Sequence, residues 1–212
     1  MDLKNVRRDY EQGKLCRDSL ANDPMQQFAQ WFAAAKDHPS QTDPTAFTLA
    51  TVGADNQPHQ RIVLLKELRD NGFVFYTNYD SQKGHDISNN SRVAMHFSWL
   101  AIEQQVRVEG FARKISREDS EAYFYSRPRE SQLGALASAQ SHPIASRSEL
   151  EARYHQLTEQ YNDQQVPMPA TWGGYLIVPE RFEFWQGGRY RLHDRFTFTK
   201  ANDAWAIERL QP

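Results

Sequence analysis

The sequence lacks cysteine pairs, a basic surplus and long apolar runs, and each absence excludes a class of protein. Cys16 is the only cysteine among 212 residues, so neither a disulfide within the chain nor a cysteine-rich metal site can form. The 25 Lys and Arg residues nearly balance 27 Asp and Glu residues, and the formal net charge of -2 gives no reason to expect nucleic-acid binding. No apolar run approaches the roughly 18 residues of a membrane span, and the charged N-terminus lacks the apolar stretch of a secretory signal. We therefore expect a cytoplasmic protein that binds no membrane.

Several nucleotide-binding and catalytic motifs are also missing. Neither a Walker A motif nor Gly-x-Gly-x-x-Gly occurs, which leaves P-loop and Rossmann nucleotide binding without support. His-Glu-x-x-His and Gly-x-Ser-x-Gly are absent as well. The seven His residues are scattered without the close spacing of metal ligands, so we expect no metal site.

What the sequence does contain is a succession of β-rich and helical stretches. Residues 1–22 are polar with little periodicity, which predicts a mobile arm, and residues 23–212 form a single predicted domain. Asp23 and Pro24 are typical of a helix start, with apolar residues at helical spacing up to residue 37. Strands are predicted at 46–52, 59–68, 73–78, 92–99, 104–115, 174–178, 181–186, 189–199 and 205–210, and helices at 81–90, from 116 and at 146–161. Short strands with tight turns, such as Asp70-Asn71-Gly72, predict an antiparallel sheet that closes into one barrel.

The densest polar cluster occupies residues 189–195, with the sequence Arg-Tyr-Arg-Leu-His-Asp-Arg. The pair Gly187-Gly188 before it fits a two-residue hairpin turn, so the cluster is predicted to begin a strand. Alternate residues of a strand share a face, which would bring the three arginines and His193 together. That arrangement is stable if an anion binds among them, or if the face is solvated and paired with Glu183 across the hairpin. The pattern alone leaves both interpretations open.

Three more clusters have the composition of phosphate sites. Residues 61–66 form an apolar strand between two cations, Arg61 and Lys66, which strict alternation puts on opposite faces where they could serve two different anions. Residues 81–85 combine Ser and Lys at a helix start, and residues 123–131 combine hydroxyls with guanidinium groups. Taken alone, charges at the ends of a buried strand and a simple helix cap are the commoner explanations of the first two clusters, and a solvated surface is the alternative for the third.

A resemblance to a known family joins these clusters. Residues 182–195, FEFWQGGRYRLHDR, resemble the C-terminal signature of the pyridoxine/pyridoxamine 5'-phosphate oxidase family. The similarity also covers residues 7–10, 43–44, 60–66, 74–78, 126–129 and 131–134. It implies a mainly β fold with α, an FMN-binding split β-barrel with flanking helices, which acts as a homodimer with both flavin sites at the subunit interface.

The resemblance implies an FMN-dependent oxidase of vitamin B6 metabolism. Such an enzyme converts pyridoxine 5'-phosphate or pyridoxamine 5'-phosphate to pyridoxal 5'-phosphate, with a hydride passing from C4' to flavin N5 and O2 reduced to H2O2. Two alternatives of the same fold are a protein that carries flavin or pyridoxal phosphate without turnover and a haem-handling protein. The presence of Arg191 and His193, for which a pure flavin binder has no need, favours the oxidase.

The resemblance also assigns roles to residues. FMN contacts are implied for Arg61, Ile62, Val63, Leu64, Leu65, Lys66, Tyr76, Thr77, Lys83, Gln105, Gln140, Ser141, Trp185 and Arg195. Substrate contacts are implied for Arg8, Tyr10, Lys66, Tyr123, Arg127, Ser131, Arg191 and His193, with Arg191 and His193 as the catalytic pair over the pyridine ring and Asp43 as a further site residue. We expect one flavin to bring Arg61 and Lys83 close to Trp185 and Arg195. Gln82 stands where family members often carry Arg, so we expect Gln82→Arg to tighten FMN binding.

Overall fold

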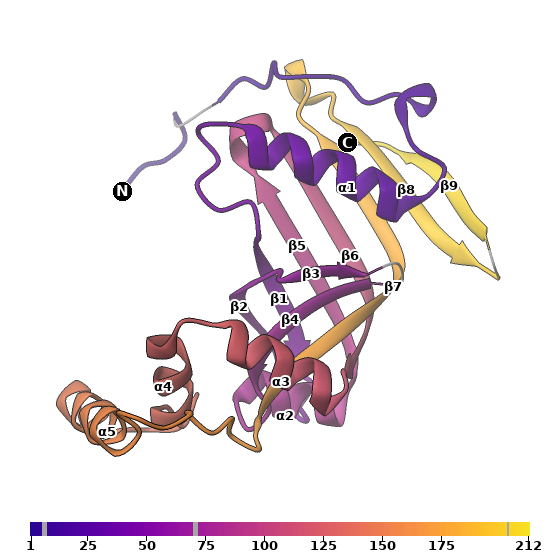
Figure 1. Ribbon diagram of the computed structural model, residues 1–212. Helices are drawn as coiled ribbons and strands as arrows, with labels where there is room; N and C mark the ends of the chain where they lie inside the picture. The colour runs from indigo at the N-terminus through magenta and orange to yellow at the C-terminus, as the bar shows by residue number, and fades with distance from the viewer. Residues whose placement is uncertain (6–7, 70–71, 203) are drawn as a thin grey trace.

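The structure is a computed structural model that describes residues 1–5, 8–69, 72–202 and 204–212 (Figure 1). Its strands are β1 (Ala46–Val52), β2 (Pro58–Leu64), β3 (Glu67–Arg69), β4 (Gly72–Asn78), β5 (Arg92–Trp99), β6 (Gln104–Lys114), β7 (Trp172–Gln186), β8 (Asp194–Ala201) and β9 (Ala204–Leu210). Its α-helices are α1 (Pro24–Asp37), α2 (Gln82–Asn89), α3 (Arg117–Ser126), α4 (Arg129–Ala137) and α5 (Arg147–Gln160), and short 3-10 helices are η1 (Arg17–Ser19), η2 (Leu100–Ile102) and η3 (Arg189–Arg191). The predicted turn residues Asp70 and Asn71, and Arg7 of the resemblance, lie outside the described residues.

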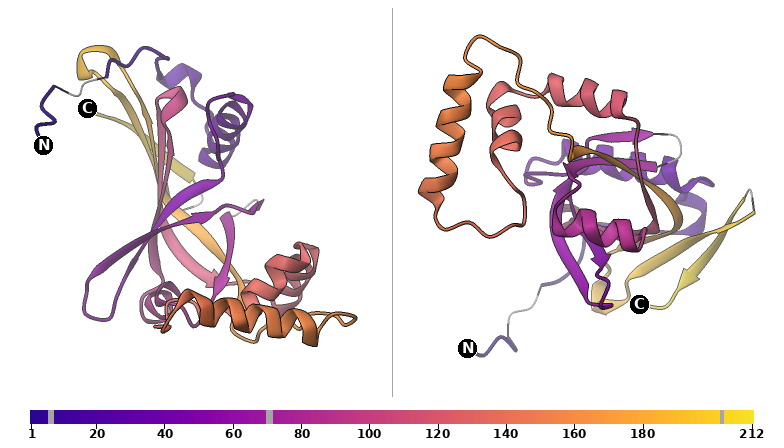
Figure 2. Two further views of the ribbon diagram at one scale, coloured as in Figure 1. Left: turned by 90° about the vertical axis from the view of Figure 1, so that its left-hand side faces the viewer. Right: turned by 90° about the horizontal axis from the view of Figure 1, so that it is seen from below.

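Within the described residues, all strands belong to one antiparallel sheet. The strand order is β2-β1-β5-β6-β7-β4-β3, and β8 extends the sheet from β7 and carries β9. The sheet curls, as Figure 2 shows, until its two ends meet where the chain crosses from β2 to β3. There the Leu65 amide donates to Thr45 O (2.9 Å) and the Lys66 amide donates to Val74 O (2.9 Å). Residues 65–66 therefore form the seam of a split barrel, which confirms the predicted fold class.

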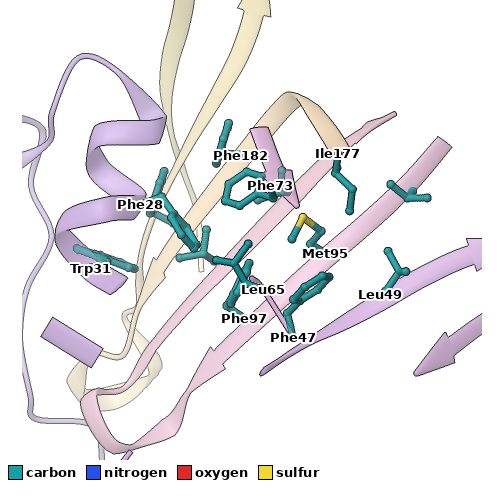
Figure 3. Close-up of a cluster of buried hydrophobic side chains, with 14 of the residues drawn as sticks. Phe28, Trp31, Phe47, Leu49, Leu65, Phe73, Met95, Phe97, Ile177 and Phe182 are labelled. Atoms are coloured by element: carbon teal, nitrogen blue, oxygen red, sulfur yellow. The ribbon is translucent and has the colours of Figure 1, made fainter. Parts of the chain in front are cut away.

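Helix α1 closes one end of the barrel and supplies part of its core. The Asp23 side chain accepts from the Gln26 amide (2.9 Å), and Pro24 occupies the first turn, as the sequence predicts. The buried ring of Phe28 packs at centroid distances of 4.9 Å against Phe73 and Phe97 (Figure 3). Burying one such ring stabilises the fold by about 1.5–3 kcal/mol.

A second apolar cluster packs together the helices at the end of the barrel opposite α1. Helices α3, α4 and α5 form a helical lobe beside the start of β7 (Figure 1). Its buried core consists of Phe124, Leu133, Val166, Met168 and Trp172. Because Trp172 is also the first residue of β7, this core fixes the lobe to the barrel.

Two predicted boundaries differ from the structure for reasons of hydrogen bonding. The strand predicted at 59–68 is split into β2 and β3, because the amide of Leu65 bonds to Thr45, just before β1, whereas the amide of Lys66 bonds to Val74 of β4. The strands predicted at 174–178 and 181–186 are one continuous strand, β7. Pro179 is accommodated there because the pairing with β6 shifts register between Glu109 and Gly110, a place where a strand tolerates proline.

β7 and β8 form an antiparallel hairpin as predicted, with Gln186 opposite Asp194, but the predicted two-residue turn at Gly187-Gly188 and the predicted strand over residues 189–193 are wrong. Residues 189–191 form η3, with Tyr190 and Arg191 at φ of 58° and 66°, and β8 begins only at Asp194. Side-chain alternation therefore fails over residues 189–193, and Arg189, Arg191 and His193 do not share a strand face with Arg195. The Gly188 amide donates to His193 Nδ1 (3.1 Å), and this bond stabilises a compact loop instead of a strand.

Candidate functional site

A cavity of about 720 Å³ opens where the seam of the barrel faces the helical lobe. We call it the seam cavity. Its lining includes the predicted site residues Arg61, Ile62, Val63, Leu64, Lys66, Tyr76, Thr77, Lys83, Tyr123, Arg127, Gln140 and Ser141. Arg61 and Lys66 line it together, so the prediction that they serve opposite faces is wrong. The reason is that β2 ends at Leu64, before Lys66, and the chain then crosses the seam.

Lys83 is a buried cation at the floor of this cavity. Its side chain is 7% exposed, and its ammonium group donates to Gln140 Oε1 (2.9 Å), Thr77 Oγ1 (3.1 Å) and Ser81 Oγ (3.1 Å). Burial, reinforced by the charge of Arg61, lowers the pKa of Lys83 to about 8. A desolvated ammonium whose hydrogen-bond acceptors are all neutral is an electrostatic site for an anion. Ser81 is the N-cap residue of α2 as predicted, but its hydroxyl does not cap the helix. The hydroxyl accepts from the Lys83 ammonium and donates to Asn78 O instead.

Arg61 supplies a second, more rigid cation. One guanidinium nitrogen, Nη1, donates to Leu49 O (3.2 Å), Thr51 Oγ1 (2.6 Å) and His59 O (3.2 Å). Burial lowers the pKa of Arg61, although a guanidinium stays charged in proteins. These bonds fix Nη1 against the barrel, and Arg61 lines the seam cavity.

The carboxylate of Asp86 lies behind Arg61, with Oδ2 3.7 Å from Arg61 Nη2. Burial favours a raised pKa for Asp86, but hydrogen bonds from Thr51 (2.6 Å), Gln82 (2.9 Å) and His59 (3.0 Å) outweigh it and lower the pKa. Asp86 is therefore an ionised anchor for Arg61. It also engages the side-chain amide of Gln82, which lines the seam cavity.

The opposite wall of the cavity is aromatic. Tyr76 stacks on Tyr123 with ring centroids 3.9 Å apart and on Trp172 at 5.4 Å. The Arg127 guanidinium lies 5.0 Å over the Trp172 ring, and burial lowers its pKa. Arg127 Nη1 is buried and has no hydrogen-bond partner within the described part of the chain. A buried, unpaired N–H on a cavity wall is a second position suited to an anion.

A separate group of predicted residues gathers at the other end of the sheet. We call Arg8, Tyr10, Trp185, Arg191 and His193 the distal cluster. The Tyr10 ring packs edge-on against the rings of His193 (5.3 Å) and Trp185 (5.7 Å), and Arg191 lies 5.7 Å over it. Arg8, Tyr10 and Arg191 also line a smaller cavity of about 310 Å³. Burial, with the charge of Arg191 as a second cause, lowers the pKa of His193.

The two groups do not meet within one chain. Trp172, at the seam cavity, is the first of the 15 residues of β7, and Trp185 is the last but one. That interval corresponds to roughly 40 Å of strand, and Figure 1 shows β7 running from the helical lobe to the end near the N-terminal segment. The expectation that Arg61 and Lys83 lie close to Trp185 and Arg195 therefore fails inside a single chain.

Further predicted residues lie near the distal cluster. Gln105 of β6 pairs with Trp185 across the sheet and bonds to His96 Nε2 (3.1 Å). Arg195 of β8 donates to Glu183 Oε1 at 2.8 and 2.9 Å, so the ion pair across β7 and β8 is confirmed.

Other predicted residues are outside both groups. Leu65 is buried in the hydrophobic core, Ser131 lies in the first turn of α4 beyond the cavity lining, and Asp43 accepts from the Thr45 hydroxyl (2.7 Å) in an exposed loop. Sequence reasoning missed Trp172 and Asn78 as cavity residues. Both stand at strand ends and have no motif of their own, so only the fold identifies them.

The chain is similar to one group of proteins over its whole length. A family model described as pyridoxamine 5'-phosphate oxidase matches residues 27–161, and one described as the pyridoxine 5'-phosphate oxidase C-terminal dimerisation region matches residues 172–212. The pyridoxine/pyridoxamine 5'-phosphate oxidases of Idiomarina loihiensis and Vibrio cholerae serotype O1 are 51% and 47% identical over 212 residues, with 100% of each chain covered. The crystal structure of PhzG from Burkholderia lata 383 in complex with tetrahydrophenazine-1-carboxylic acid aligns with a TM-score of 0.87 and 25% identity, covering 93% of this chain and 98% of that one. In the described residues, none of the helices has the length and apolar character to cross a membrane.

Proposed function

Because the chain belongs to the pyridoxine/pyridoxamine 5'-phosphate oxidase family, we propose that its seam cavity binds FMN and the substrate phosphate in a homodimer whose second subunit completes each site. The enzyme oxidises pyridoxine 5'-phosphate or pyridoxamine 5'-phosphate to pyridoxal 5'-phosphate, a reaction of vitamin B6 biosynthesis. FMN, when bound, supplies the hydride acceptor and passes the electrons to O2. A cytoplasmic location stays a prediction.

The buried Lys83 ammonium is the observation that carries this proposal. FMN and the substrate each end in a phosphate dianion, and the seam cavity offers two separate cationic positions for them. Lys83 and Arg61 lie together on the barrel side and fit the FMN phosphate. Lys66 and Arg127, whose Nη1 has no hydrogen-bond partner among the described residues, fit the substrate phosphate on the side of the lobe.

The distal cluster fits the same site only if it comes from the partner subunit. It lies roughly 40 Å along β7 from the seam cavity, and FMN is far shorter than this. The match to a C-terminal dimerisation region spans residues 172–212, which include Trp185, Arg191, His193 and Arg195. A symmetric dimer would bring the distal cluster of each subunit over the seam cavity of the other.

Within this arrangement, Arg191 and His193 orient the reacting part of the substrate. The Gly188 amide donates to His193 Nδ1, so a neutral imidazole carries its proton on Nε2. The lowered pKa of His193 favours this neutral form at pH 7. Nε2–H can then donate a hydrogen bond to the hydroxyl oxygen on C4', or to the amine nitrogen in its unprotonated form, while the Arg191 guanidinium holds the ring. Gripping the remote phosphate supplies binding energy for this placement.

An aerobic assay with the FMN-loaded protein tests the function. Addition of pyridoxine 5'-phosphate should yield pyridoxal 5'-phosphate, measured by its absorbance, and an equal amount of H2O2. Arg191→Ala should lower kcat/KM, since the ring loses its guanidinium contact. A protein that binds yellow FMN but forms neither product would instead be a flavin carrier, and a protein that stays colourless with added FMN would contradict the cofactor assignment.

A further inference from the structure

Glu103 is a buried carboxylate that holds the N-terminal segment at the distal cluster. It follows η2, has a left-handed φ of 56° and is 4% exposed. Its Oε2 accepts from the amides of Glu11 (2.7 Å) and Gln12 (2.9 Å), and its Oε1 accepts from Arg8 Nη2 (3.2 Å). Three donors from five consecutive positions of the segment therefore converge on one side chain.

The same residue also holds the loop that carries the proposed catalytic pair. Glu103 O accepts from the Gly187 amide (2.8 Å) and from Gln186 Nε2 (3.3 Å). Gly187 is the first residue of the loop 187–193. Glu103 therefore contacts the segment through its side chain and the loop through its main chain.

Tyr10 is the part of the segment that these bonds position. Its ring lies so close to Gly187 that a Cβ atom there would approach Tyr10 Cδ1 to 2.5 Å. It contacts both Trp185 and His193, and Arg191 lies over its face. A shift of residues 8–12 would therefore move the packing around the proposed catalytic pair.

We propose that Glu103 is a positioning residue that fixes residues 8–12 against the loop 187–193 and so presents Tyr10, Arg191 and His193 to the substrate as one unit. This inference rests on the proposed function. Burial makes the carboxylate dependent on these donors, because a desolvated charge without them is costly. The segment must therefore dock in one register. The ion pair between Arg189 and Glu11 (2.8 Å) is exposed and contributes little.

The test uses FMN-loaded Glu103→Gln, which keeps the shape but replaces one acceptor oxygen by an NH2 group. The KM for pyridoxine 5'-phosphate should rise about tenfold or more, with kcat and the FMN dissociation constant within about twofold of the parent. Trypsin cleavage after Arg8 and Lys14 should be faster than in the parent. Saturating pyridoxine 5'-phosphate should slow this cleavage in the parent but not in the variant. Glu109→Gln on β6, the strand that begins directly after Glu103, is the control and should change neither readout.

A second variant separates positioning from damage to the core. Gln12→Pro removes one amide donor from an exposed residue and leaves the barrel untouched. It should reproduce the higher KM and the faster cleavage. The inference is overturned if both variants match the parent in KM and cleavage rate, if cleavage accelerates without a change in KM, or if FMN affinity falls while KM rises. A parent enzyme that forms no pyridoxal 5'-phosphate would refute the proposed function, whereas the cleavage rates would still report on the Glu103 contacts.

Discussion

FMN affinity should decrease as the pH rises above about 8, because binding requires the charged form of Lys83. Burial and the neighbouring Arg61 lower the pKa of Lys83 from 10.5 to about 8 in the free cavity. A phosphate dianion beside the ammonium raises this pKa again in the complex, so binding takes up a proton above pH 8. At pH 9 about one tenth of the lysine is charged, and the affinity should be about tenfold lower than at pH 7, or about 1.4 kcal/mol.

The free protein should respond to pH in the opposite direction. A lysine whose folded-state pKa is lowered destabilises the fold while it stays charged, and this cost disappears as the pH rises from about 8 toward 10.5. Lys83 should thus add up to about 3 kcal/mol to the free energy of unfolding of the FMN-free protein over that range. Below about pH 6 protonation of the phosphate itself should weaken FMN binding.

Quenching of FMN fluorescence, titrated at constant ionic strength from pH 6 to 9.5, measures the affinity. Lys83→Met is the matched control, because it keeps the length of the side chain and removes the titrating group. Its affinity should be low and nearly independent of pH between 7 and 9. An unchanged parent affinity over that interval, or the same slope in Lys83→Met, would refute the reasoning.

Three further outcomes follow from single contacts. Trp172→Leu removes the aromatic ring over which the Arg127 guanidinium lies. The KM for pyridoxine 5'-phosphate should therefore rise about tenfold, while the FMN dissociation constant stays constant. A parallel loss of FMN affinity would contradict this. Gln82→Arg adds a charge next to Asp86 and should tighten FMN binding by about 1–2 kcal/mol in the same fluorescence titration, and no change would reject the role of position 82. Phe28→Ala empties part of the core and should lower the free energy of unfolding by about 3–5 kcal/mol in urea, whereas a loss below 1 kcal/mol would show that the site repacks.

Local sequence rules predicted the elements whose signals are local. The helix at 24–37 has its cap and first-turn proline in consecutive positions, and β1 has the expected bounds. The seam at residues 65–66 was not predictable from local patterns, because it depends on hydrogen bonds to Thr45, just before β1, and to Val74 of β4. For the same reason, alternation gave the wrong relation between Arg61 and Lys66.

The candidate site depended on the resemblance more than on residue patterns. Composition identified basic clusters but no pattern identified FMN. The alternation of residues 189–193 was misleading, because Tyr190 and Arg191 adopt left-handed φ values that non-glycine residues seldom adopt. The separation of the seam cavity from the distal cluster follows from the length of β7, which the sequence analysis divided into two strands.

Complementation between subunits tests most directly whether each site is built from two chains. Lys83→Ala inactivates the seam cavity, and Arg191→Ala inactivates the distal cluster, so each variant alone should be nearly inactive. The two variants are mixed in equal amounts, unfolded and refolded together with FMN. Half of the resulting dimers would be hybrids, each with one intact site out of two, so about a quarter of the parent activity should return. Activity that stays at the level of the separate variants, although hybrid dimers are present by native mass spectrometry, would contradict a shared site.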